Sequence, residues 1–154
     1  MAISVHTTVI AGEHHVDVES GDEVFVRIKE FIPHPDYNFF GSLWSNDIAL
    51  LILEEPLPLG PRPGRAIALK AAKLTEEEIV PGTSVTVMGF GHLKYGGNES
   101  KVLRKGDSGG PVVLTERPDV VVGTVCGGYK CGEKPGVYSN MYDFVDWVNA
   151  NKVD

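Results

Sequence analysis

A serine between glycines is the residue of this sequence best suited to covalent chemistry. Ser108 lies in Gly106–Pro111, which reads Gly-Asp-Ser-Gly-Gly-Pro, and the apolar run Val112–Leu114 follows it. Glycines on both sides allow steep backbone conformations and let N–H groups converge on one point, as an oxyanion site requires. The pattern therefore predicts that Ser108 is a nucleophile.

Two kinds of hydrolase use a serine in such a turn. The Gly-x-Ser-x-Gly elbow of α/β-hydrolases opens into a helix, and its histidine follows the serine. Here Pro111 and a β-branched run predict a strand, and every histidine precedes Ser108. The five are His6, His14, His15, His34 and His92. The elbow is nearly excluded, and the motif instead resembles the trypsin/chymotrypsin-like serine peptidases, whose triad runs His, Asp, Ser.

A second motif agrees with this resemblance. Ser45–Leu53 reads Ser-Asn-Asp-Ile-Ala-Leu-Leu-Ile-Leu and is similar to the strand start that carries the family's triad aspartate. The resemblance implies that Asp47 orients the imidazole, and that the N–H groups of Gly106 and Ser108 form the oxyanion hole. It also implies that Asp107 pairs with a freed N-terminus during activation.

The elements that must position these residues are mostly strands. Many short β-branched runs, together with 18 glycines and 10 prolines, favour an all-β fold. The resemblance implies an incomplete double β-barrel of Greek-key strands with a C-terminal helix, forming one peptidase domain over 1–154. Its parts are a remnant of the first barrel (1–55), a connector (56–80), a remnant of the second barrel (81–140) and the helix (141–152).

Two parts of the family pattern are missing. The general base of the family stands in Thr-Ala-Ala-His-Cys, and counting back from Gly12 and Glu13 puts it on or about Met1, where no such motif occurs. His6 is the nearest substitute. Between Tyr95 and Gly106 the chain is also too short for the base of a specificity pocket, so primary specificity cannot be read. We therefore expect a serine endopeptidase relative that is catalytically incomplete as written.

Two other functions stay open at this stage. A non-catalytic homologue would use the fold as a binding or regulatory module and hold a peptide strand at an exposed edge. An active endopeptidase would need another chain to supply its missing parts and cover its strand edges. In each case the expected partner is a peptide or protein that acts as substrate, inhibitor or ligand.

The resemblance also implies a substrate pocket, lined by Cys126, Gly127, Gly128 and Gly136. Small residues at Gly128 and Gly136 would leave its entrance open to a large side chain. Only one other cysteine, Cys131, is present. Two free thiols and a Cys126–Cys131 disulfide both remain possible.

An acidic loop after the first expected strand resembles the calcium loop of trypsins. The resemblance implies Glu13 and Glu23 as carboxylate ligands, with the carbonyls of His15 and Val18 completing the protein ligands. Hard oxygen ligands suit Ca²⁺. The alternative is a solvated acidic loop without a metal, and no cofactor is required for the expected chemistry.

Charge and hydropathy limit the remaining partners. The net charge of -7 and the lack of basic clusters argue against nucleic acid and against an anionic membrane surface. No apolar stretch reaches the roughly 20 residues that cross a bilayer. Met1–Ile10 lacks the basic start of a signal peptide, whereas the resemblance implies a secreted, extracellular protein.

Overall fold

The computed structural model describes most of the 154-residue chain. The described residues are 7–38, 45–60, 70–71, 74, 78, 80–92, 97–104, 110–128 and 136–153. The chain forms two compact units, one of Met1–Ala68 with Val148–Asp154 and the other of Leu69–Trp147. The boundary between residues 68 and 69 lies within the stretch expected to connect two barrels, 56–80.

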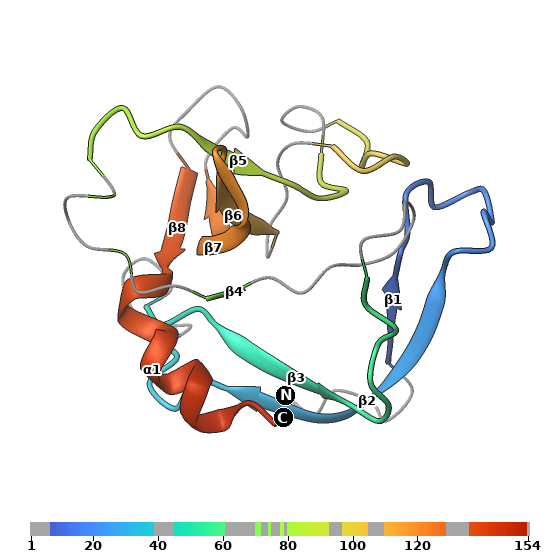
Figure 1. Cartoon of the computed structure of the whole chain (residues 1–154), viewed down its shortest axis with the longest axis horizontal. Coiled ribbons are helices and arrows are strands. Elements are labelled where there is room, and N and C mark those ends of the chain that lie inside the picture. The colour runs from blue at the N-terminus through green and yellow to red at the C-terminus, as the bar shows by residue number, and fades with distance from the viewer. Residues whose placement is uncertain are drawn as a thin grey trace. The chain divides into compact units, whose positions relative to one another are not determined.

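Three antiparallel strands make the sheet of the first unit. They are β1 (Thr8–Ala11), β2 (Val24–Pro33) and β3 (Ala49–Leu53), in the order β1-β2-β3, so that β2 is the central strand (Figure 1). Within β2, Val26 and Ile28 are buried while Phe25, Arg27 and Lys29 are exposed. This alternation is the expected signature of a strand with one apolar face.

β2 continues past the alternating residues 24–29 as far as Pro33. A β-bulge between Ile28 and Glu30 shifts the register, after which Phe31 and Ile32 pair with Leu51 and Leu50 of β3. The extra residue of a bulge bends a strand without ending it. β2 therefore bends at the bulge and ends only at Pro33.

A five-stranded sheet forms the second unit. Its strands are β4 (Lys70–Ala71), β5 (Val85–Val87), β6 (Pro111–Leu114), β7 (Arg117–Gly128) and β8 (Gly136–Asn140), in the order β4-β7-β6-β5 with β8 also paired to β7. All pairs are antiparallel except that of β4 with β7. The long strand β7 thus has β6 along one side, and β4 followed by β8 along the other.

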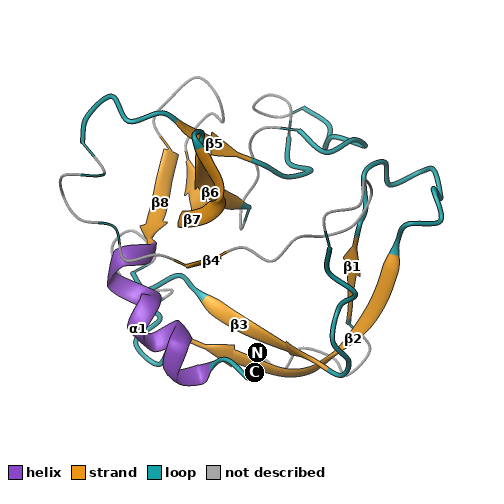
Figure 2. Cartoon of the chain, viewed as in Figure 1, coloured by secondary structure: helices purple, strands orange, loops and turns teal. Residues whose placement is uncertain are grey.

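One helix follows the last strand directly. α1 spans Met141–Asn151 (Figure 2), close to the expected 141–152. It buries Met141, Phe144 and Val145. These positions follow the i, i+3, i+4 spacing of an apolar helix face. The fold is therefore all-β with a C-terminal helix, and neither sheet closes into a barrel within the described ranges, as expected for an incomplete double barrel.

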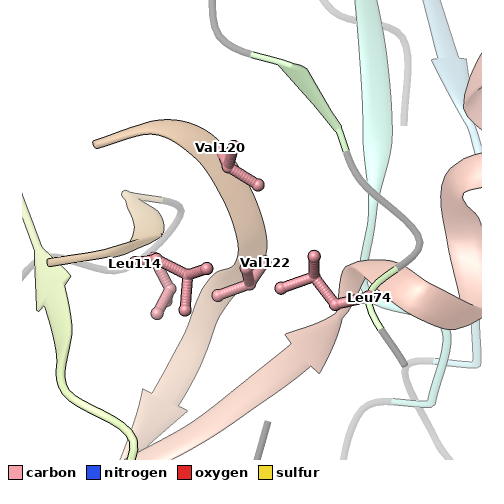
Figure 3. Close-up of a cluster of buried hydrophobic side chains, with 5 residues drawn as sticks. Leu74, Leu114, Val120 and Val122 are labelled. Carbon is pink, nitrogen blue, oxygen red and sulfur yellow. The ribbon is translucent and has the colours of Figure 1, made fainter. Parts of the chain in front are cut away.

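The apolar core of the second unit lies against β6 and β7. Val112 and Leu114 of β6 pack with Val120 and Val122 of β7 and with Leu74, and all five are buried (Figure 3). Val113 is completely buried, so three consecutive residues of β6 are shielded on both faces. A continuous apolar run is typical of a central strand covered on both sides.

Strands β7 and β8 approach each other closely at Gly123. A Cβ atom at this position would lie 2.6 Å from the backbone oxygen of Ser139 in β8. Backbone cannot move aside as a flexible side chain can. Glycine is therefore the residue that lets β8 pair with β7 at this point.

We predict that Gly123→Ala destabilises the protein by about 1–3 kcal/mol, the usual cost of overpacking. Urea unfolding monitored by circular dichroism measures the change. Gly60→Ala is the matched control, because no atom lies within 4 Å of a Cβ there. If both variants unfold at the wild-type urea concentration, the close approach at Gly123 is wrong.

Candidate active site

The predicted nucleophile lies in a short segment anchored at both ends. Residues 105–109, and with them Gly106, Asp107 and Ser108, lie outside the described residues. Before this segment, Arg104 and Gly89 exchange two backbone hydrogen bonds of 2.8 and 2.7 Å. After it, the N–H of Val125 in β7 donates to the carbonyl of Gly110 over 3.0 Å. The residue before this segment is thus held by Gly89, which follows β5, and the residue after it by β7.

The chain leaves the serine turn as a strand. β6 begins at Pro111, and Pro111 is the register partner of Thr124 in β7. A nucleophile elbow would lead into a helix at this point. The prediction from Pro111 and the β-branched run is therefore confirmed.

Asp47 sits at the centre of a tight turn before β3. The N–H of Ile48 donates to the carbonyl of Asn46 over 2.9 Å, which closes a three-residue turn around Asp47. Asn46 has a φ of 56°, a left-handed conformation that asparagine tolerates, and its side-chain amide donates to the carbonyl of Asp36 over 3.0 Å. The Asp47 side chain is consequently held half-buried at the end of a fixed turn.

Pairing of β7 with β8 gathers the expected pocket residues. Gly127 pairs with Val137, and Gly128 pairs with Gly136. Cys126 lies next to them, and its sulfur is 2.9 Å from the hydroxyl oxygen of Ser139, a buried residue of β8. Cys126 has a free thiol in this structure, and Cys131 lies outside the described residues.

Tyr138 adds a feature that the sequence did not indicate at this pocket. A Cβ atom on Gly136 would lie 2.7 Å from the Tyr138 hydroxyl and 3.2 Å from its Cε2 atom. The phenol ring therefore occupies the space beside Gly136. Access past Gly136 requires rotation of the Tyr138 side chain, which is half-exposed. Gly136 and Tyr138 are two residues apart in β8, so they lie on the same face of the strand. This shared face was the only sequence signal for their contact.

The imidazoles of two histidines are turned toward their own backbone. Nδ1 of His15 accepts the N–H of Asp17 over 3.3 Å, and Nδ1 of His34 accepts the N–H of Asp36 over 3.2 Å. In a serine peptidase triad, Nδ1–H instead donates to the aspartate. His15 and His34 are therefore not arranged as triad bases, and His6 lies outside the described residues.

The acidic loop between β1 and β2 is folded around its two end carboxylates. Glu13 Oε1 accepts the N–H of His15 over 2.8 Å. Glu23 Oε1 accepts the N–H and the hydroxyl of Ser20 over 2.8 and 2.7 Å, and its Oε2 accepts the N–H of Gly21 over 2.9 Å. These bonds, the Ser20 N–H first, lower the pKa of Glu23 to about 2. Glu23 is therefore an anion at any physiological pH.

The loop contains carboxylate and carbonyl oxygens, which are the kind of ligand that a hard cation binds. Besides the two carboxylates, the carbonyl of His15 accepts the N–H of Val18 over 2.8 Å. Among the residues described, no group of three His, Cys, Asp or Glu side chains is placed to hold a metal ion. The expected site needs only two carboxylates, with backbone carbonyls as its other ligands.

No helix in the described part of the chain is both long and apolar enough to cross a membrane. α1, at 11 residues, is far shorter than the roughly 20 residues needed.

Comparison with known proteins gives consistent matches along the chain. The family model described as Trypsin matches residues 3–105 and 104–148. The anionic trypsin of Canis lupus familiaris is 29% identical over 179 residues, covering 90% of this chain and 68% of that protein. The trypsin of Sus scrofa is 28% identical, covering 89% and 72% respectively. Putative trypsin-6 of Homo sapiens is 30% identical, covering 93% and 70%.

Proposed function

The chain belongs to the trypsin family, and from this premise we propose that residues 1–154 carry the nucleophile and the orienting acid of a serine endopeptidase but hydrolyse peptide bonds negligibly on their own. Ser108 is the nucleophile and Asp47 the acid. The observation that carries this proposal is Gly-Asp-Ser-Gly-Gly-Pro running directly into strand β6, with Gly110 hydrogen-bonded to β7.

The roles of these residues follow from the chemistry of acyl transfer. The Ser108 hydroxyl would attack the scissile carbonyl, while the N–H groups of Gly106 and Ser108 would stabilise the resulting oxyanion. The Asp47 carboxylate would hold the Nδ1–H of a histidine so that its Nε2 accepts the serine proton. Asp107, beside the nucleophile, would pair with a freed N-terminal ammonium in the active form.

The role that this proposal leaves unfilled in residues 1–154 is that of the general base for Ser108. None of the five histidines stands in the Ala-Ala-His-Cys motif of the family. The acceptor geometry at Nδ1 of His15 and His34 supports the same view, because a ring that accepts a hydrogen bond at Nδ1 cannot donate from it to a carboxylate. Without a base, the serine hydroxyl stays protonated and is a weak nucleophile.

We predict that a fluorophosphonate probe leaves Ser108 unlabelled in the isolated chain. Peptide hydrolysis should be about 10⁶-fold slower than with a complete triad, because triad members act as a unit. Intact-protein mass spectrometry measures the labelling, and a fluorogenic peptide measures turnover.

Two variants make this test specific. Ser108→Ala removes the proposed nucleophile, and Ser84→Ala removes an exposed serine elsewhere in the second unit. Stoichiometric labelling that Ser108→Ala abolishes and Ser84→Ala preserves would mean that the chain already contains a working base.

A second candidate function, that of a non-catalytic binding module, is supported by the outer edge of β5. Ser84 and Met88 form backbone hydrogen bonds toward Thr115 and Pro111, on the β6 side. In an antiparallel ladder the intervening residues, Val85 and Val87, direct their backbone groups to the other side. Gly89, two residues after Val87, directs its backbone groups to that same outer side, where it pairs with Arg104. A peptide strand could extend this pairing along Val87 and Val85.

We predict that Val85→Pro abolishes peptide binding at this edge, because proline removes the outward N–H without touching the ladder to β6. Val85→Thr keeps the N–H and should bind as the wild type does. Fluorescence anisotropy of a short labelled peptide rich in valine and threonine measures the affinity. Equal binding by both variants, or none by the wild type, contradicts a binding role for this edge.

Calcium binding by the loop between β1 and β2 is part of the same proposal. Glu13 and Glu23 would supply carboxylates, and His15 and Val18 backbone carbonyls. The low pKa of Glu23 supports a cation site, since the carboxylate is charged at any physiological pH. The bound ion would stabilise the loop in the folded state only.

Calcium at millimolar concentration should therefore raise the melting temperature of the protein, because a ligand of the native state stabilises it by mass action. Glu23→Gln should remove this effect, while Asp22→Asn, an equal change of charge at a neighbouring exposed position, should keep it. Differential scanning fluorimetry with and without a chelator measures the shift. Melting that is independent of calcium contradicts the site.

We also propose an extracellular location, by family membership. The partners would be peptides or proteins that act as substrates, inhibitors or edge ligands, or a chain that covers the exposed strand edges. Neither nucleic acid nor a membrane is among them, given the net charge of -7 and the lack of basic clusters.

A further inference from the structure

An asparagine in the segment before the serine turn stands in an acceptor sequence for N-linked glycans. Asn98-Glu99-Ser100 has the form Asn-x-Ser with no proline at the middle position. Of the six asparagines, only Asn98 has serine or threonine two residues later; the others are Asn38, Asn46, Asn140, Asn149 and Asn151. The sequence thus offers a single acceptor.

The structure presents this tripeptide with its two ends in different surroundings. Asn98 and Glu99 are exposed, whereas Ser100 is only 5% exposed. The N–H of Ser100 donates to the carbonyls of Phe90 and Gly91, both over 3.1 Å, and its hydroxyl donates to the carbonyl of Val102 over 2.6 Å. The hydrogen bonds of Ser100 therefore hold this segment in place, and Asn98 lies at its solvent-exposed end.

A further pairing fixes the direction of the segment. Glu99 forms an isolated antiparallel bridge with His92, and Arg104 forms another with Gly89. The residues from Glu99 to Arg104 therefore run back along the chain that follows β5. A large polar group on Asn98 would extend into solvent without disturbing either bridge, because Asn98 lies beyond the last of them.

We propose that Asn98 is N-glycosylated. The side-chain nitrogen of Asn98 forms a bond to C1 of the first sugar of a lipid-pyrophosphate-linked oligosaccharide. The bond from C1 to the pyrophosphate oxygen breaks, the lipid pyrophosphate leaves, and the amide nitrogen gives up one proton. No oxidant or reductant takes part. The proposal rests on the extracellular location proposed above, because this transfer takes place during secretion.

The burial of Ser100 is compatible with this modification. Transfer takes place on the chain before it folds, when the Ser100 hydroxyl is still exposed to the transferase. Folding then turns the hydroxyl inward to Val102 and leaves the modified Asn98 outside. The same serine therefore serves recognition first and anchoring of the segment afterwards.

The consequence for the molecule concerns the approach to the serine turn. The glycan would stand on the segment whose end, Arg104, pairs with Gly89 just before residues 105–109. It would add a bulky, solvated group to that face of the second unit. Proteases and partner proteins would then be kept from this anchored segment.

The experiment expresses the full chain behind a secretory leader in animal cells and treats it with peptide N-glycosidase. We expect the enzyme to shift the protein to a lower apparent mass on a gel in one step. Peptide mass spectrometry should detect conversion of Asn98 to aspartate. Asn98→Gln should abolish the shift, and Asn149→Gln, at an exposed asparagine outside any acceptor sequence, should retain it.

Substitutions at Ser100 separate recognition from folding. Ser100→Thr keeps the acceptor sequence and should keep the shift, whereas Ser100→Ala should lose it. A wild-type chain that reaches the medium without a glycan would overturn the proposal while leaving the extracellular location intact. A shift that persists in Asn98→Gln would overturn it as well. Retention of the wild-type chain in the cell with the glycan attached to Asn98 would contradict only the location.

Discussion

The pairing of β7 with its neighbours is the constraint on which the second unit depends. β7 bonds to β6 on one side and to β4 and β8 on the other, and its residues Val120 and Val122 supply the core. Gly123 permits β8 to approach, and the N–H of Val125 holds Gly110 at the exit of the serine turn. The same strand then continues to Cys126 and Gly127. β7 therefore holds Gly110, directly after residues 105–109, on its β6 side and pairs Gly127 and Gly128 of the expected pocket with β8.

In the first unit, a local network takes the place of a large core. Only Val26, Ile28 and Ile52 of its sheet are buried, and the ion pair between Arg27 and Glu54 is exposed, so it adds little stability. The loop between β1 and β2 is closed instead by hydrogen bonds to Glu13 and Glu23. Acidic side chains that satisfy backbone N–H groups give this loop a defined shape despite its polar composition.

Open sheet edges connect the fold to its possible functions. Neither sheet closes among the residues described, and none of those residues pairs with the outer side of β5 next to the Gly89 and Arg104 pair. An edge of this kind pairs readily with another strand. Both functions proposed above need such an edge, one for a partner chain that supplies missing parts and the other for a bound peptide strand.

The sequence by itself determined the family to which the chain belongs and part of its local structure. Pro111 and its β-branched run predicted the strand β6, and the glycines around Ser108 predict a nucleophile turn, because both features depend on neighbouring residues alone. Only the tertiary structure decided that Lys70–Ala71 pairs with β7, that Tyr138 lies beside Gly136, and that the imidazoles of His15 and His34 accept backbone N–H groups. Strand pairing across some fifty residues and the choice of side-chain rotamer depend on contacts formed by the folded chain, and a local pattern does not encode them.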